Sequence, residues 1–251
     1  METHASTAPS RIVIEGPAQA VAVATEMTTD GRRSALGPLL KAIYPRVGSE
    51  RMMSRLRRLC LTLEGGPGLS LTIREILSEH YRVRVGLHTP TPCVVPPKVY
   101  HSGTSFGRYT HVADTLRTFT RNHPFETKST HGLFYNAALG RVNLPPLPAI
   151  QLRIGNGVWI DHNTIILPPT EVIGEGAIIT AGSVVYTNVP PYAIVGGFPA
   201  RTIGYRFPKP RIEELLAARW WEFPPEKVAE FERNADLAAA AIPIARKSTA
   251  A

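Results

Sequence analysis

The chain has little cysteine and no long apolar run. Only Cys60 and Cys93 occur among its 251 residues, which provides neither a disulfide framework nor a cysteine-based metal site. No apolar stretch approaches the roughly 18 residues that a membrane-spanning helix needs. The first residues lack a basic segment followed by a solid apolar one, so we expect no signal peptide. These absences favour a cytoplasmic protein that does not insert into a membrane.

Nucleic-acid and nucleotide-binding motifs are also missing. The chain has no zinc-finger, RNP-type or basic-zipper pattern, no Walker-type loop and no Rossmann fingerprint after a strand. The net charge of +8 alone would allow nucleic acid, an acidic membrane or an anionic small ligand. The basic run RMMSRLRR at 51–58 is better explained by an amphipathic helix with a solvated basic face, because its apolar residues recur near helical spacing. These are Met52, Met53, Leu56, Leu59 and Leu63. We therefore expect no nucleic-acid partner.

A hexapeptide period between Ile154 and Val185 is the clearest pattern in the chain. The segment divides into IGNGVW, IDHNTI, ILPPTEV, IGEGAI, ITAGSV and VYTNVP, so six steps open on Ile or Val and one step has seven residues. Two ordinary hairpins with glycine turns would also use such residues. Six aliphatic residues in phase favour a β-solenoid instead, with one short strand and one corner per hexapeptide.

The repeat phase predicts which side chains form the core. The opening aliphatic residue of each hexapeptide should point inward, and Gly155, Gly174 and Gly182 should allow the chain to turn. Traces of the period in VGLHTP, FGRYTH and VADTLR make 119–150 a loop inserted into the solenoid. The predicted inward residues of the main repeat are Ile154, Ile160, Ile166, Ile173, Ile179 and Val185.

Helices should flank this solenoid on both sides. Ser70 is a candidate N-cap for a helix with Ile73, Ile76 and Leu77 on one face. Prolines at 208 and 210 precede a second amphipathic segment, and a further helix should start at Pro225. The expected divisions are a disordered extension (1–35), a helical segment (36–84), the solenoid domain (85–207), C-terminal helices (208–241) and a tail (242–251).

These motifs together resemble the hexapeptide-repeat acyltransferases. The repeat is followed by VPPYAIVGGFPARTIGYRF at 189–207 and RIEELLAARWWEFPPEKV at 211–228, and the loop contains RNHPFETKSTHGLFYN at 121–136. This combination is similar to the xenobiotic (chloramphenicol and streptogramin) acetyltransferase and polysaccharide O-acetyltransferase branch. The likeness runs from about residue 70 to residue 232 and leaves residues 1–69 outside.

The resemblance implies a fold, an assembly and an activity. The fold would be a left-handed parallel β-helix, mainly β, with an inserted active-site loop and flanking helices. The assembly would be a homotrimer with acetyl-CoA in the cleft between adjacent subunits. The activity would be acetyl transfer from acetyl-CoA to a hydroxyl of an antibiotic, a secondary metabolite or a sugar, with no metal.

His123 matches the position of the family's catalytic histidine. A neutral imidazole suits the removal of the acceptor's hydroxyl proton and typically contributes on the order of 10²–10⁴-fold. Without the resemblance, Asn122-His123-Pro124 would equally well only shape a turn. His131 is the rival base, although an anchor for the loop explains it better.

The remaining candidates fall into an acceptor group and a donor group. On the acceptor side, packing of the loop explains the aromatic residues as well as a pocket wall does, and a solvated carboxylate explains Glu126 as well as contact with the acceptor does. On the donor side, small residues allow close approach of pantetheine, and Arg201 is a candidate phosphate or adenine partner. The acceptor group is Asn122, Phe125, Glu126, His131 and Tyr135. The donor group is Trp159, His162, Thr180, Ala181, Gly182, Gly197, Pro199 and Arg201.

Several residues depart from the family pattern. Asp161-His162 stands where small residues follow Trp-Ile, and the family more often has Pro-Gly at Pro168-Pro169, Pro at Gly132 and Asn at Phe198. Bulk at 161–162 could reshape the donor cleft. These substitutions motivate a second hypothesis, a catalytically inactive scaffold. A carbonic-anhydrase-like metalloenzyme is a third, but its closely spaced histidine ligands are missing from the sequence.

Overall fold

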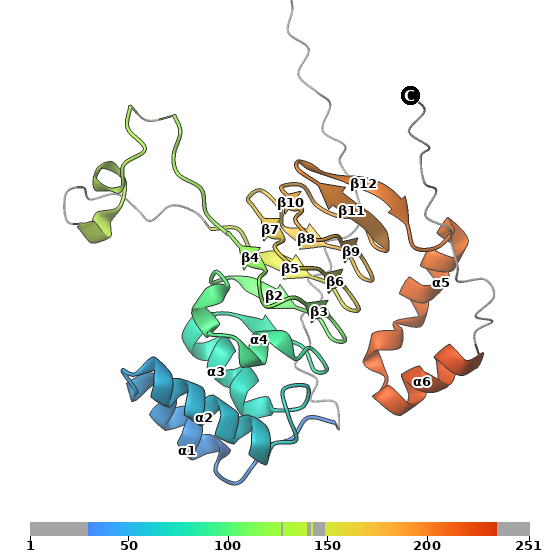
Figure 1. The fold of residues 1–251 in the computed structure, drawn as a ribbon, viewed down its shortest axis with the longest axis horizontal. Coiled ribbons are helices and arrows are strands. Elements are labelled where there is room, and N and C mark those ends of the chain that lie inside the picture. Colours follow the sequence, from blue (N-terminus) through green and yellow to red (C-terminus); the bar gives the residue numbers. More distant parts are fainter. Residues whose placement is uncertain (1–29, 127, 140–141, 143–148, 235–251) are drawn as a thin grey trace, which may run out of the picture.

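The structure is a computed structural model that describes residues 30–126, 128–139, 142 and 149–234. Three helices pack at one end of a stack of β-coils, and a β-hairpin lies at the other end (Figure 1). The helices are α1 (Gly37–Ile43), α2 (Glu50–Leu63), α3 (Leu71–Tyr81), α4 (Thr91–Val94), α5 (Lys209–Ala218) and α6 (Pro225–Asn234). Short 3₁₀ turns are η1 (Tyr44–Arg46), η2 (Pro97–Val99), η3 (Gly132–Phe134), η4 (Ala137–Leu139) and η5 (Trp220–Glu222).

The N-terminal helices follow the sequence only in part. Ser70 caps α3 by accepting a hydrogen bond from the Ile73 amide, and the predicted apolar face of α3 is buried. Helix α2 exists, and its expected apolar face is confirmed only in part: Met53 and Leu56 pack against the core, but the helix also turns Arg57 and Cys60 inward. The apolar residues of α2 that remain exposed are Met52, Leu59 and Leu63.

The prediction that residues 1–35 are disordered is also wrong for the last residues of this segment. Arg32 forms a parallel bridge with Ser70, and the Ser34 amide donates to the buried carboxylate of Glu64. Glu64 also accepts hydrogen bonds from Ser70 and Thr72, so this segment helps to satisfy a carboxylate that has no access to water. Residues 1–29 of the extension, and the tail, lie outside the described residues.

Twelve short strands build three sheets in the described part of the chain. The sheets have the orders β1-β2-β5-β8, β10-β7-β4 and β12-β11-β9-β6-β3, and all pairs are parallel except β11 with β12. The strands are β1 (Arg84–Val85), β2 (Thr104–Phe106), β3 (His111–Val112), β4 (Arg117–Thr118), β5 (Leu152–Ile154), β6 (Trp159–Ile160), β7 (Ile165–Ile166), β8 (Val172–Ile173), β9 (Ile178–Ile179), β10 (Val184–Val185), β11 (Ala193–Gly197) and β12 (Ala200–Tyr205).

The inward residues of successive coils lie one above another, as the repeat phase predicts. Ile154 pairs with Ile173, Ile160 with Ile179, and Ile166 with Val185. All six side chains are at most 1% exposed. The predicted repeat and its core are therefore confirmed.

Glycines allow the coils to approach closely at one corner. Gly86, Gly107, Gly155 and Gly174 occupy the same place in successive coils, and a Cβ on any of them would lie within 3 Å of the backbone of the next coil. Gly182 serves differently: its φ of +69° is the left-handed conformation that favours glycine.

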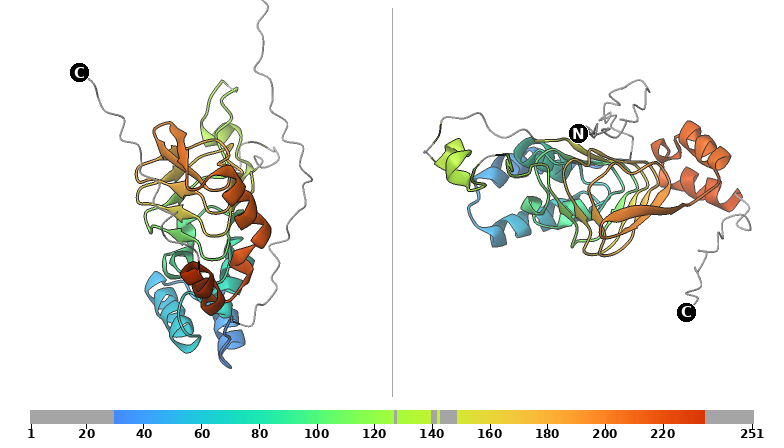
Figure 2. Two further views of the ribbon diagram at one scale, coloured as in Figure 1. Left: turned by 90° about the vertical axis from the view of Figure 1, so that its right-hand side faces the viewer. Right: turned by 90° about the horizontal axis from the view of Figure 1, so that it is seen from above.

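The C-terminal helices cover one side of the solenoid. The Trp220 ring occupies the space where Gly157 has no side chain, and its Nε1 donates to the Tyr192 hydroxyl at 3.0 Å. Helix α6 begins at Pro225, as predicted. Seen along a second direction, α5 and α6 lie on the flank opposite the inserted loop (Figure 2).

The inserted loop leaves the solenoid between β4 and β5 and projects from it (Figure 1). Its neck is closed by a hydrogen bond from the Ile150 amide to the Thr120 carbonyl, at 2.9 Å. Beyond the neck, η3 and η4 are its regular elements among the described residues. The described part of the loop therefore projects from the solenoid without entering the core.

Candidate active site

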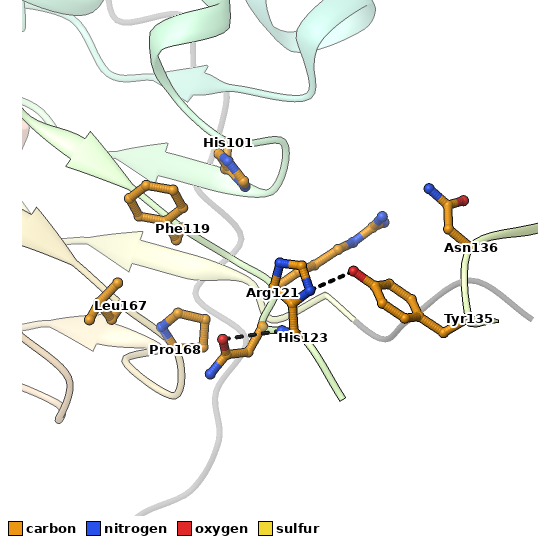
Figure 3. A pocket seen from close by; sticks show the side chains of 9 residues that line it. His101, Phe119, Arg121, His123, Tyr135, Asn136, Leu167 and Pro168 are labelled. Carbon is orange, nitrogen blue, oxygen red and sulfur yellow. Dashed lines mark hydrogen bonds between the residues drawn. The ribbon is translucent and has the colours of Figure 1, made fainter. Parts of the chain in front are cut away.

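A pocket of about 550 Å³ lies where the loop meets the solenoid (Figure 3). The loop contributes its polar residues, and the ends of β4 and β7 contribute apolar ones. The lining residues are His101, Phe119, Arg121, Asn122, His123, Tyr135, Asn136, Leu167 and Pro168.

The contacts of His123 favour one tautomer. Its Nδ1 lies 3.0 Å from the Thr130 carbonyl oxygen and 2.6 Å from the Tyr135 hydroxyl. A carbonyl can only accept, whereas a hydroxyl can accept or donate, so the tautomer that satisfies both contacts has the proton of the neutral ring on Nδ1 and the lone pair on Nε2. Within the described residues no group hydrogen-bonds to Nε2. His123 can therefore accept a proton at Nε2.

His131 has the opposite tautomer. Its Nδ1 accepts a hydrogen bond from the Leu133 amide at 3.2 Å and caps η3, so the proton of the neutral ring is on Nε2. Its own amide donates to the Ser129 hydroxyl at 3.2 Å. These are the contacts of a residue that anchors the loop.

The other acceptor candidates separate into two groups. Asn122 and Tyr135 line the pocket with His123, and the Asn122 side-chain oxygen accepts from the His123 amide at 3.1 Å. Phe125, Glu126 and His131 do not line it. The Phe125 side chain is 77% exposed and Glu126 is exposed, so within this chain neither walls the acceptor pocket.

Part of the lining was not predicted from the sequence. Phe119 and Leu167 follow the inward residues of β4 and β7, and the Phe119 amide donates to the Ile166 carbonyl at 2.9 Å. Extending the repeat phase by one residue would have paired these two outward side chains. His101 and Arg121 carry no comparable signal, because the path of the loop and of the preceding turn brings them here.

The donor candidates occupy an open corner and the adjoining hairpin. At the corner, the Gly182 amide donates to the His162 carbonyl at 2.8 Å, and a Cβ on Gly182 would meet nothing within 4 Å. Ala181 beside it is exposed. Trp159, 46% exposed on β6, leads toward the same corner. Backbone groups here are accessible from solvent.

The β11–β12 hairpin approaches this corner closely. A Cβ on Gly196 would lie 2.5 Å from the Thr180 hydroxyl. Gly197 and Pro199 lie at the exposed hairpin turn. Arg201 on β12 donates to the Tyr186 hydroxyl at 2.7 Å and lies over the Tyr186 ring. This contact holds an exposed guanidinium beside the corner.

Asp161 and His162 are accommodated on the outside of the coil. The Asp161 carboxylate accepts a hydrogen bond from the His162 amide at 2.7 Å. The His162 ring lies 3.3 Å from the Thr115 hydroxyl and 3.9 Å from the Asp114 carboxylate, and its side chain is 64% exposed. Their bulk therefore leaves the coil intact and places an imidazole on the surface of the donor corner.

The acceptor and donor candidates do not meet within one chain. None of the donor candidates lines the pocket at His123. The loop projects to one flank, whereas the hairpin closes the end of the stack (Figure 1).

The described residues offer neither a metal-ligand cluster nor a membrane-spanning helix. Residues 30–126, 128–139, 142 and 149–234 contain no group of three His, Cys, Asp or Glu side chains that could hold a metal ion. None of the helices in these ranges is long and apolar enough to cross a membrane.

Sequence comparison relates the repeat-bearing part of the chain to known acetyltransferases. No family model matches the chain. It is 41% identical over 130 residues to a chloramphenicol acetyltransferase of Agrobacterium fabrum, a match that covers 51% of this chain and 57% of that protein. It is 40% identical over 55 residues to galactoside O-acetyltransferase of Escherichia coli, covering 22% and 27%. The matches thus span less than two thirds of these relatives.

Acetyltransferases are also found among the solved structures that match this chain, at low similarity. A galactoside acetyltransferase in complex with coenzyme A matches with a TM-score of 0.39 and 18% identity, over 67% of this chain and 78% of that one. The sequence matches confirm the resemblance inferred from the motifs: over about half of its length the chain is similar to an acetyltransferase of chloramphenicol, and over a shorter stretch to one of galactosides.

Proposed function

We propose that the protein is an acetyl-CoA-dependent O-acetyltransferase that acts on a hydroxylated small molecule. The observation that carries this proposal is the position of His123 in a pocket with Nδ1 against the Thr130 carbonyl, which leaves Nε2 to accept a proton. The relatives named above, which are acetyltransferases of chloramphenicol and galactosides, support the class of reaction.

In this proposal His123 acts as a general base. Its Nε2 takes the acceptor's hydroxyl proton while the hydroxyl oxygen attacks the thioester carbonyl. The carbon–sulfur bond then breaks, and the imidazolium returns the proton to the departing thiolate, so the products are an O-acetyl ester and free CoA. The Thr130 carbonyl keeps the ring oriented and stabilises the imidazolium through Nδ1–H.

The groups at the donor corner suit the chemical groups of CoA. Open backbone around Ala181 and Gly182 suits the amides of pantetheine, and Arg201 suits a phosphate. Trp159, His162, Thr180, Gly197 and Pro199 would complete this surface.

Because acceptor and donor groups are apart within one chain, we further propose that one subunit supplies His123 and its neighbour supplies the donor corner. The exposed apolar residues of the loop, including Phe125 and Phe134, support its burial by another subunit. A homotrimer of left-handed β-helices would provide three such sites.

The test is a panel of hydroxylated acceptors, including chloramphenicol and galactosides, incubated with acetyl-CoA. Free-thiol release and the product mass are read together, so that hydrolysis of the thioester is separated from transfer. The proposal expects an acetylated product and an equal amount of free CoA. Release of thiol without any acetylated acceptor would count against it.

A further inference from the structure

The pocket at His123 has two chemically different sides. Phe119, Leu167 and Pro168 form an apolar side, whereas Tyr135 and Asn136 lie on the other side of His123 (Figure 3). The Arg121 side chain extends beside His123 toward this polar side. No Asp or Glu is among the nine lining residues.

Arg121 provides a positive charge that the described protein does not neutralise. Some arginines of the described chain are held by carboxylates, as Arg33 is by Glu75 and Arg153 by Glu175. For Arg121, no carboxylate of the described residues lies within ion-pair distance. An arginine at a pocket without a carboxylate partner can offer its planar set of donors to a ligand.

His101 does not share this charge. Burial lowers the pKa of the His101 imidazole, and the nearby Arg121 charge lowers it further. His101 is thus neutral at neutral pH, and its ring packs against Phe119 with centroids 5.1 Å apart. Arg121 is consequently the one permanently charged side chain among the nine described lining residues.

The apolar side is built by the solenoid itself. Phe119 and Leu167 lie on adjacent coils, because Thr118 pairs with Ile166 in the sheet. Phe119 is 36% exposed, so part of its ring is available to a ligand. A rigid apolar surface beside a cation favours a ligand that has both an apolar group and an anionic group.

We propose that the acceptor is an amphipathic hydroxy compound with an oxyanion, most simply a carboxylate. The carboxylate binds Arg121, the apolar group packs on Phe119 and Leu167, and the hydroxyl lies between them at His123. This assignment of acceptor class rests on the proposed function.

The test uses two acceptors that differ only in charge: p-nitrophenyl glucuronide and its uncharged carboxamide. Binding of each to the full-length protein is measured by ligand-observed NMR, and acetylation is measured separately. Arg121→Gln removes the charge, Arg121→Lys retains it without the planar fork, and Arg117→Gln removes a neighbouring charge outside the pocket lining. A phosphate monoester of the same aryl glycoside tests whether another oxyanion can replace the carboxylate.

We expect the wild type and Arg117→Gln to prefer the carboxylate roughly ten-fold or more in binding, as a charge-assisted hydrogen bond allows. Arg121→Gln should lose this preference and Arg121→Lys should keep part of it. Equal binding of the two compounds by the wild type, or an unchanged preference in Arg121→Gln, would overturn the proposal. Arg121-dependent binding without acetylation would support the anion site and count against the proposed function. Acetylation of both compounds at equal rates would support the proposed function and count against the anion site.

Discussion

At the scale of single residues, two histidines of one loop are distinguished by which ring nitrogen faces the backbone. His123 meets a carbonyl and keeps Nε2 as an acceptor, whereas His131 meets an amide and keeps Nε2 as a donor. A base at Nε2 is therefore available only at His123. This difference is invisible in the sequence, where both residues stand among similar polar neighbours.

His123→Ala should consequently lower turnover by roughly two to four orders of magnitude, the usual contribution of a general base. His131→Ala is the matched control and should cost less, because its loss affects only the order of the loop. Steady-state kinetics with an acceptor identified in the panel gives both values. A deeper defect in His131→Ala at unchanged CoA affinity would reverse the assignment.

Arg201 is the residue that we expect to bind a phosphate of CoA. Arg201→Ala should weaken CoA binding, and the difference from the wild type should shrink as salt is added, because screening weakens an exposed ion pair. Calorimetry at two salt concentrations measures this, with Arg211→Ala, on α5, as the control. Unchanged affinity in Arg201→Ala would move the phosphate site elsewhere, for example to Arg206 or Lys209.

At the scale of elements, a hexapeptide of the solenoid has one residue that must be apolar. Ile160→Asp should unfold the protein or lower its free energy of unfolding by at least about 4 kcal/mol, because the carboxylate would be buried without a partner. His111→Asp, at an exposed position of the same sheet, should be nearly neutral. Thermal or denaturant unfolding followed by circular dichroism compares them. Cooperative folding of Ile160→Asp at wild-type stability would contradict the observed core.

The elements also show what could be predicted from the sequence. The phase of the repeat followed from Ile and Val alone, since the opening position of each hexapeptide is aliphatic whereas the second buried position also holds Thr, Ser or Ala. The start of α6 followed from Pro225. Which face of α2 is exposed could not be predicted from the sequence, because Arg57 is buried against the Tyr44 hydroxyl, which comes from another element. For the same reason Arg121 and His101 were missed: the course of the loop brings Arg121 to the pocket and the turn before β2 brings His101 there, and no period describes either segment.

At the scale of the whole molecule, the separation of His123 from the donor corner makes a single chain incomplete for the proposed reaction. Ala181→Trp should block the donor corner, and His123→Ala should remove the base. If the site is shared between subunits, co-expressed mixtures of the two variants should be more active than either alone, since some interfaces would combine an intact loop with an intact corner. No gain in mixtures that are shown to form hetero-oligomers would place both groups in one subunit.

The most direct test of the central claim, that His123 is the base of an acetyl transfer, compares wild type and His123→Ala in one experiment. CoA affinity, oligomer mass and the rate of formation of the acetylated acceptor are measured on the same preparations. The account predicts unchanged affinity and mass, with product formation lowered at least about a hundred-fold. Acetylation at the wild-type rate by His123→Ala would contradict it.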